Sequence, residues 1–179
     1  MLIAGAGIAG IAAALALAAG GVAVEVLEAR DTLEEAGAGV QLGPNAVRAL
    51  ASLGLADRVG SLGFAPEAIE IREGQSGSRL ARLPLGQSVE ERFGDPYWCL
   101  HRQDLHSALL AAAEQQSGIR IIRGFRLASL EETPAGVLAK GADGSLAHGS
   151  ALVGADGVWS AARTAILGEP PPRFTGHAA

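Results

Sequence analysis

The chain has 179 residues, a formal net charge of −5 and a single cysteine, Cys99. This length suits one domain, or one domain with part of a second. Hydrophobic residues make up 49% of the chain and charged residues 18%, a composition that indicates a globular protein. The 14 lysines and arginines are scattered along the sequence, so no nucleic-acid partner is expected. One cysteine cannot form an internal disulfide or a thiolate metal site, and no two histidines have metal-ligand spacing. We therefore expect no metal and a reducing compartment.

The first 24 residues contain no charged side chain, and their length alone would permit a membrane span. No Lys or Arg precedes them, as a signal peptide or a positive-inside flank would require, and glycines divide the run into short pieces. A fully buried βαβ unit is also apolar throughout. We therefore expect a cytoplasmic chain with no membrane association.

Strand, helix and strand follow one another within the first thirty residues. Residues 2–4 are predicted to form a short apolar strand and residues 8–19 a helix, which Gly20 and Gly21 end. Residues 22–27 are predicted to form a valine-rich second strand. This order predicts a parallel βαβ unit.

Beyond this unit strands and helices alternate, which predicts an α/β fold. Residues 28–43 are rich in glycine and lack periodicity, so we expect a loop. Cys99 lies in an apolar run and is expected to be a buried structural thiol. The other predicted elements are a helix over 45–53, a hairpin of strands 68–72 and 79–83, a strand over 97–101, a helix over 103–116, a strand over 119–123, a three-stranded meander over 126–148, a strand over 151–154 and a helix over 160–167.

The turn between the first strand and the first helix fits the pattern G-x-G-x-x-G, with Gly5, Gly7 and Gly10. The first glycine allows a tight turn, the second lets a pyrophosphate approach the backbone, and the third lets the helix pack closely on the strand. The N–H groups at the start of the helix, at Ile8 and Ala9, then favour a bound anion. The alternative is that these glycines only pack against one another.

Glu28 closes the second strand, 18 residues after Gly10. A carboxylate at this position accepts hydrogen bonds from the ribose hydroxyls of a dinucleotide. It would also repel a 2′-phosphate, so the sequence predicts bound FAD or NAD rather than NADP. The alternative is a solvated acidic residue at a strand end.

Three further stretches carry a resemblance. They are Gly-Ala-Gly-Val-Gln-Leu-Gly-Pro-Asn-Ala at 37–46, His-Arg-Gln-Asp-Leu at 101–105, and Gly-Ala-Asp-Gly-Val-Trp-Ser at 154–160, followed by Arg163. Together they resemble the flavoprotein aromatic hydroxylases, a family that includes salicylate hydroxylase and 3-hydroxybenzoate 6-hydroxylase. The resemblance covers essentially the whole chain in the right order, and it moves the expected cofactor from a dinucleotide in general to FAD.

The resemblance implies additional FAD-binding residues. Arg102 would lie near the pyrophosphate or the ribityl chain, and Asp156, with Gly157, would take part in flavin binding and in productive use of the nicotinamide cofactor. Ala29 and Arg30 would lie near the adenosine, and Gln41 would reach the flavin side of the pocket. From the residues alone, both arginines could instead be surface side chains, and Asp156 could be a turn residue bonded to its own backbone.

The resemblance implies a Rossmann-like βαβ FAD-binding domain over residues 1–179, with a three-stranded β-meander. Residues 62–98 would be an excursion toward the substrate domain and contribute part of its hairpin. The family's second flavin-binding segment and its substrate-binding portion have no counterpart in the sequence, so the domain is expected to be incomplete. The open face could promote association between molecules.

The family implies an FAD-dependent monooxygenase that uses NAD(P)H and O2 to hydroxylate a small aromatic compound. These 179 residues are expected to bind FAD at most, and no catalytic residue can be named. Two alternatives stay open. One is a truncated, catalytically silent nucleotide-binding module, and the other is an FAD-dependent oxidoreductase that inserts no oxygen.

Overall fold

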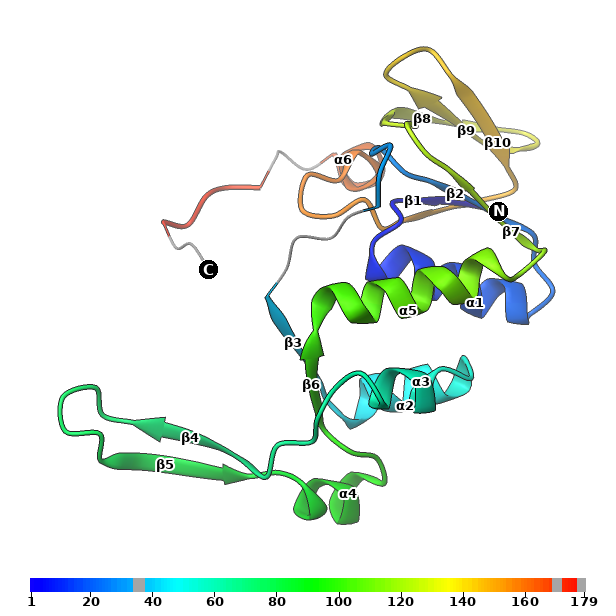
Figure 1. Cartoon of the computed structure of the whole chain (residues 1–179). Coiled ribbons are helices and arrows are strands. Elements are labelled where there is room, and N and C mark those ends of the chain that lie inside the picture. Colours follow the sequence, from blue (N-terminus) through cyan, green and yellow to red (C-terminus); the bar gives the residue numbers. More distant parts are fainter. Residues whose placement is uncertain (34–37, 169–171, 177–179) are drawn as a thin grey trace. The chain divides into compact units, whose positions relative to one another are not determined.

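The computed structural model describes residues 1–33, 38–168 and 172–176. The chain divides into two compact units (Figure 1). The first consists of Met1–Glu34 and Leu109–Ala179, and the second of Glu35–Ala108. The expected excursion, residues 62–98, lies within the second unit.

A parallel four-stranded sheet is the centre of the first unit. Its strands are ordered β11-β1-β2-β7, and every neighbouring pair is parallel. The helix α1 joins β1 to β2, which is the predicted βαβ connection. Every residue of β1 is buried, as expected for a parallel strand covered on both faces. These elements are β1 (Leu2–Ala4), α1 (Ile8–Ala19), β2 (Val24–Leu27), β7 (Ile119–Ile122) and β11 (Leu152–Gly154).

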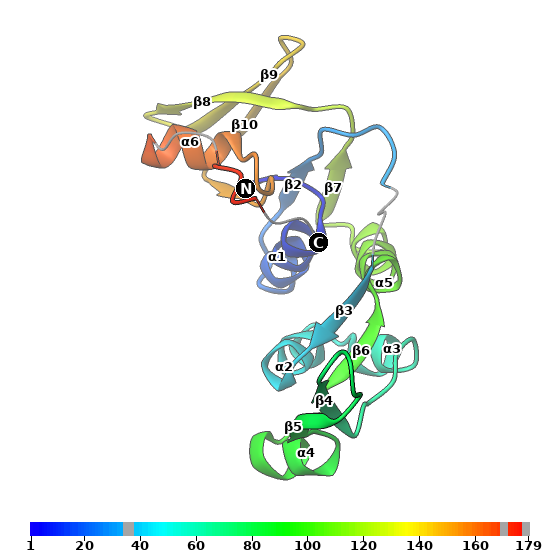
Figure 2. The same ribbon diagram turned by 90° about the vertical axis from the view of Figure 1, so that its left-hand side faces the viewer.

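Two layers cover this sheet, one on each face. Figures 1 and 2 show α1 on one face and the antiparallel meander β10-β9-β8 on the other. Leu2, Leu27 and Phe125 form a buried cluster with Ala139 and Ala147 of the meander, so one part of the core lies between the two sheets. A short helix, α6, packs on β8. These elements are β8 (Leu127–Thr133), β9 (Gly136–Gly141), β10 (Leu146–Gly149) and α6 (Ala161–Leu167).

The second unit is built around an antiparallel pair, β3 with β6, and three short helices. Gly60 contacts Trp98 so closely that a Cβ at Gly60 would lie 2.9 Å from the indole Cζ2. The hairpin β4-β5 is largely exposed. The elements are β3 (Gly39–Leu42), α2 (Pro44–Ser52), α3 (Ala56–Gly60), β4 (Ala68–Arg72), β5 (Arg79–Pro84), α4 (Gln87–Phe93), β6 (Trp98–His101) and α5 (Arg102–Glu114), which continues into the first unit.

Most predicted elements are present within one or two residues of their expected bounds, but three expectations differ from the structure. The prediction of a loop over 28–43 is wrong for Gly39–Leu42, because this segment pairs with β6 despite its glycine content. The short helices α3 and α4 were not predicted. Cys99 is only partly buried; it lies in the two-stranded β3-β6 ladder and also bridges to Phe64.

The described residues contain neither a membrane-spanning helix nor a cluster of metal ligands. None of the helices described is long and apolar enough to cross a membrane. Within the same ranges, no group of three or more His, Cys, Asp and Glu side chains is arranged to hold a metal ion.

Candidate dinucleotide-binding site

The loop between β1 and α1 requires glycine at two of its three glycine positions. Gly5 has φ +98°, a conformation that residues with a side chain rarely adopt. A Cβ at Gly5 would also approach the carbonyl carbon of Ala155 to 2.8 Å. At Gly10 a Cβ would overlap the carbonyl oxygen of Gly5. The first and third glycines of the motif therefore let the loop, the helix and the neighbouring turn pack against one another.

Gly7 differs from its two partners because it faces open space. A Cβ at this position would meet no atom of the described chain within 4 Å. Gly7 is also the N-cap residue of α1, with φ −72° and ψ −179°, and no side chain caps the helix there. The first N–H groups of a helix have no acceptor within the helix, and they lie at the positive end of its dipole. The loop thus offers donors to an anion at the one glycine that leaves room for it.

Glu28 lies at the end of β2, beside this loop, and only 5% of its surface is exposed. Its Oε2 accepts a hydrogen bond from the N–H of Ala6 at 2.8 Å. Its Oε1 accepts from the backbone N–H of Arg30 at 2.9 Å and from the Arg30 guanidinium at 3.1 Å. A carboxylate oxygen has two lone pairs, so Oε2, which accepts one of these bonds, can accept a further hydrogen bond from a ribose hydroxyl.

The carboxylate of Glu28 is held in its charged form. Burial raises its pKa, but the N–H groups of Ala6 and Arg30 and the Arg30 guanidinium outweigh that effect, so the pKa lies below the usual value. Arg30 itself is half exposed, with 45% of its side-chain surface accessible. Its carbonyl oxygen accepts a hydrogen bond from the N–H of Gly124 at 3.3 Å. Ala29, which lies between Glu28 and Arg30 in the sequence, is partly buried.

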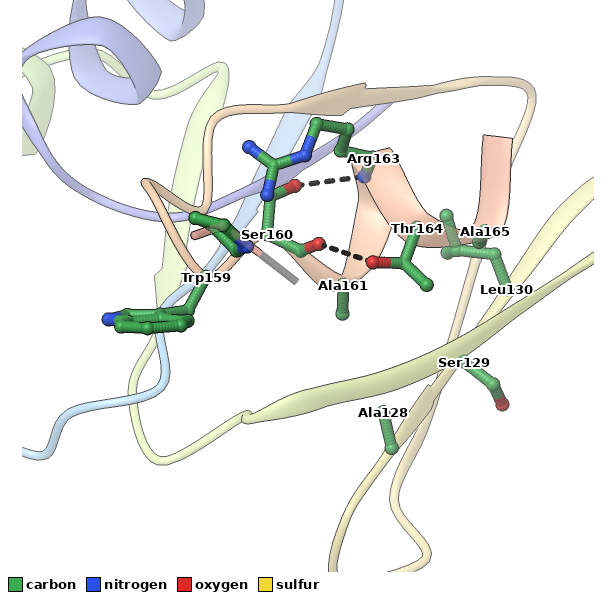
Figure 3. A pocket seen from close by; sticks show the side chains of 10 residues that line it. Ala128, Ser129, Leu130, Trp159, Ser160, Ala161, Arg163, Thr164 and Ala165 are labelled. Carbon is green, nitrogen blue, oxygen red and sulfur yellow. Dashed lines mark hydrogen bonds between the residues drawn. The ribbon is translucent and has the colours of Figure 1, made fainter. Parts of the chain in front are cut away.

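Asp156 lies in the turn between β11 and α6, and both of its carboxylate oxygens bond toward that helix. Oδ1 accepts from the hydroxyl of Ser160 at 2.5 Å, and Oδ2 accepts from the N–H of Ala162 at 3.1 Å. Gly157 follows with φ +81° and is exposed. Ser160 is the N-cap residue of α6 and accepts from the N–H of Arg163 at 2.9 Å (Figure 3).

Ser160 was missed as a functional candidate in the sequence. The signal was present, because a serine directly before an apolar helical segment is a typical N-cap residue. Next to it, Trp159 borders an open groove of about 580 Å³ between α6 and β8 (Figure 3). Trp159 is 74% exposed. The groove is lined by Ala128, Ser129, Leu130, Trp159, Ser160, Ala161, Arg163, Thr164, Ala165 and Pro172.

Gln41 and Arg102, the other two predicted FAD contacts, belong to the second unit. Gln41 lies on β3, where its Oε1 accepts a hydrogen bond from the Tyr97 hydroxyl at 2.7 Å. Burial, and then the charge of Cys99, raise the pKa of Tyr97. Arg102 begins α5, is exposed, and donates its backbone N–H to the carbonyl oxygen of Ala38 at 3.2 Å. Gly37, which opens the resembling segment 37–46, lies outside the described residues.

A family model described as an FAD binding domain matches residues 1–173. The chain belongs to this family. The family confirms FAD as the expected cofactor, which the three resembling stretches favoured over NAD, and the matched residues include Asp156.

Individual relatives point to the same class of enzyme. The chain is 39% identical to a 3-hydroxybenzoate 6-hydroxylase of Aquipseudomonas alcaligenes over 99% of its own length and 45% of the relative's. It is also 39% identical to a 3-amino-4-hydroxybenzoate 2-monooxygenase of Streptomyces cremeus, over 98% of the chain and 44% of the relative. The chain therefore spans less than half the length of these curated relatives.

A solved structure shows the same fold with the cofactor present. Klebsiella pneumoniae HpxO, crystallised with FAD and uric acid, superposes with a TM-score of 0.83 at 32% identity. The match covers 96% of this chain and 43% of HpxO. The expectation of an α/β fold typical of FAD-dependent monooxygenases, present in part, is confirmed.

Proposed function

We propose that this chain binds FAD through the β1-α1 loop and Glu28, and that it serves an FAD-dependent monooxygenase that hydroxylates a small aromatic compound. The observation that carries the proposal is the contrast among the three loop glycines. Gly5 and Gly10 are closed in by backbone, whereas Gly7 faces open space at the start of α1. This is the arrangement that a pyrophosphate requires.

The chain's own residues would act by binding and orientation. The N–H groups at the start of α1 would bind the pyrophosphate, and the charged carboxylate of Glu28 would accept the ribose hydroxyls. Bound FAD would supply the redox chemistry, in which NAD(P)H, a proton and O2 convert an aromatic C–H to C–OH with release of NAD(P)⁺ and water. Direct FAD contacts by Ala29, Arg30, Gln41, Arg102, Asp156 and Gly157 remain predictions, as does a cytoplasmic location.

The second candidate is a nucleotide-binding module without catalysis of its own. It is favoured by large apolar side chains that are exposed around α6 and beyond it, namely Val158, Trp159, Ile166, Leu167 and Phe174. An apolar surface of this kind indicates a partner or a further segment of polypeptide. An FAD-dependent oxidoreductase that inserts no oxygen is the third candidate, and it would bind FAD through the same loop and Glu28.

The test is to purify the 179-residue chain, record its visible spectrum and identify any released nucleotide by chromatography. A yellow protein that releases FAD supports the binding proposal. The full-length gene product is then assayed for NAD(P)H oxidation, with hydroxylated product measured against peroxide. Oxidation that yields only peroxide with every aromatic acid and phenol tested would contradict monooxygenation, and a colourless full-length protein would contradict FAD binding.

A further inference from the structure

The turn at 154–157 lies directly behind the β1-α1 loop. Gly154 pairs with Ala4 across the β11-β1 ladder, and the N–H of Ala155 donates to the carbonyl oxygen of Ala4 at 2.8 Å. A Cβ built on Gly5 would lie 3.0 Å from the Cα of Asp156, and one built on Gly10 would lie 3.4 Å from the Ala155 methyl group. Gly5 and Gly10 thus pack against Ala155 and Asp156 of this turn.

The turn is held by a small hydrogen-bonded network at the start of α6. Asp156 accepts from the Ser160 hydroxyl and from the Ala162 N–H, and the Ser160 oxygen accepts in turn from the Arg163 N–H. Ser160 is buried. Its carbonyl oxygen also accepts from the Thr164 hydroxyl at 3.2 Å (Figure 3). These bonds fix the distance between the turn and the helix that packs on β8.

Close packing leaves the turn little freedom to move by itself. A Cβ at Gly154 would come within 2.8 Å of the Ala162 methyl group, so α6 and β11 are in direct contact. A shift of α6 would therefore move Gly154 and Ala155, and Ala155 touches the loop. Because packed interiors transmit small displacements instead of absorbing them, the loop geometry depends on this contact.

We propose that Asp156 and Ser160 are a positioning pair for the dinucleotide loop. They set the place of Gly5 and Gly10 through Ala155, which packs against both glycines, whereas Gly7 faces open space. This inference rests on the proposed function, in which the loop binds the FAD pyrophosphate. It adds Ser160 to the residues that matter for the cofactor, and it gives the Asp156 carboxylate an effect on binding that does not require contact with FAD.

The test uses the 179-residue chain without ligand, labelled with ¹⁵N at glycine. The variants are Ser160→Ala and Asp156→Asn, with Ser160→Thr as a rescue that keeps the hydroxyl. Asp143→Asn is the matched control, because Asp143 accepts from the Ser145 hydroxyl and N–H in the exposed turn between β9 and β10 and bonds to none of the residues of this network. The amide signals of Gly5, Gly7 and Gly10 are compared in each protein.

We expect those three signals to shift in Ser160→Ala and Asp156→Asn, to return in Ser160→Thr, and to stay unchanged in Asp143→Asn. Shifts confined to Gly154, Gly157 and Gly168 would mean that the network only caps α6, and would overturn the proposal. If Ser160→Ala does not fold, Asp156→Asn decides, since it keeps the volume of the side chain and loses one acceptor.

Titration with FAD, followed by flavin fluorescence, separates this inference from the proposed function. We expect FAD to bind about fivefold to tenfold more weakly to Ser160→Ala than to the parent, as for the loss of one hydrogen bond. A parent that binds FAD while the loop signals do not move contradicts the positioning pair alone. A parent that binds no FAD, with loop signals that shift as expected, contradicts the FAD proposal and supports the pair.

Discussion

The carboxylate of Glu28 accepts a hydrogen bond from the backbone N–H of Ala6, with 2.8 Å between Oε2 and the nitrogen. The bond joins the end of β2 to the middle of the β1-α1 loop, across 22 positions of sequence. The residue that is expected to bind the ribose therefore also holds the loop that is expected to bind the pyrophosphate.

Glu28→Gln is expected to destabilise the fold by about 1–3 kcal/mol, because an amide has one accepting oxygen and cannot keep the hydrogen bonds that both carboxylate oxygens accept. The donors concerned are the N–H groups of Ala6 and Arg30. Urea unfolding followed by circular dichroism measures the change. Glu131→Gln is the control, since Glu131 pairs with Lys140 on the exposed meander and such a pair contributes at most about 1 kcal/mol. Equal losses in the two variants would contradict a special role for Glu28.

Stability should also depend on pH through Glu28. Its pKa is lower in the folded chain than in the unfolded chain, where it is about 4.3. The stabilisation is therefore complete above the unfolded pKa and is lost as the pH falls through the folded pKa. The difference in urea midpoint between the parent and Glu28→Gln should shrink between about pH 5 and the acid limit of folding. A difference that stays constant over this range would show that the charge of Glu28 does not contribute.

Phe125 is predicted to contribute strongly to the packing of the meander on the parallel sheet. It is 5% exposed and lies in the buried cluster with Leu2, Leu27, Ala139 and Ala147. Phe125→Ala should cost about 3–5 kcal/mol, since it removes a large buried side chain and leaves a cavity. Phe174→Ala is the control, because Phe174 is 78% exposed. Thermal unfolding of the three proteins checks both expectations, and a similar midpoint for all three would show that this cluster is not the core of the unit.

The sequence predicted the first βαβ unit well because two local signals agreed. The buried strands read as apolar runs, and Gly20 and Gly21 marked the end of α1. The strand β3 was not predicted, since its glycine-rich sequence becomes a strand only by pairing with β6, which lies far along the chain. The helices α3 and α4 are too short to show a periodicity. Tertiary pairing thus decides where local propensity is weak.

The same limit applies to the candidate site. Spacing alone predicted Gly5, Gly7, Gly10 and Glu28 as candidate residues, because the chemistry of a phosphate loop fixes the residue types and their order. The direction of a carboxylate is not encoded in that pattern. Both oxygens of Asp156 point toward α6, and only the folded chain reveals that Ala155, next to it, touches the loop.

Gly7 and Gly10 give the sharpest test of the loop, because one glycine serves binding and the other serves the fold. Gly7→Asp places a carboxylate at the N-cap of α1, where Asp is a favoured residue and where the described chain leaves the space open. The variant should be at least as stable as the parent and should bind FAD at least about tenfold more weakly, since its charge repels the pyrophosphate. Gly10→Ala should instead fail to fold or lose several kcal/mol, because its Cβ overlaps the Gly5 carbonyl oxygen. Thermal unfolding without ligand and FAD titration, measured on the same preparations, separate the two effects. Unchanged FAD affinity in a folded Gly7→Asp protein would show that the dinucleotide does not bind at this loop.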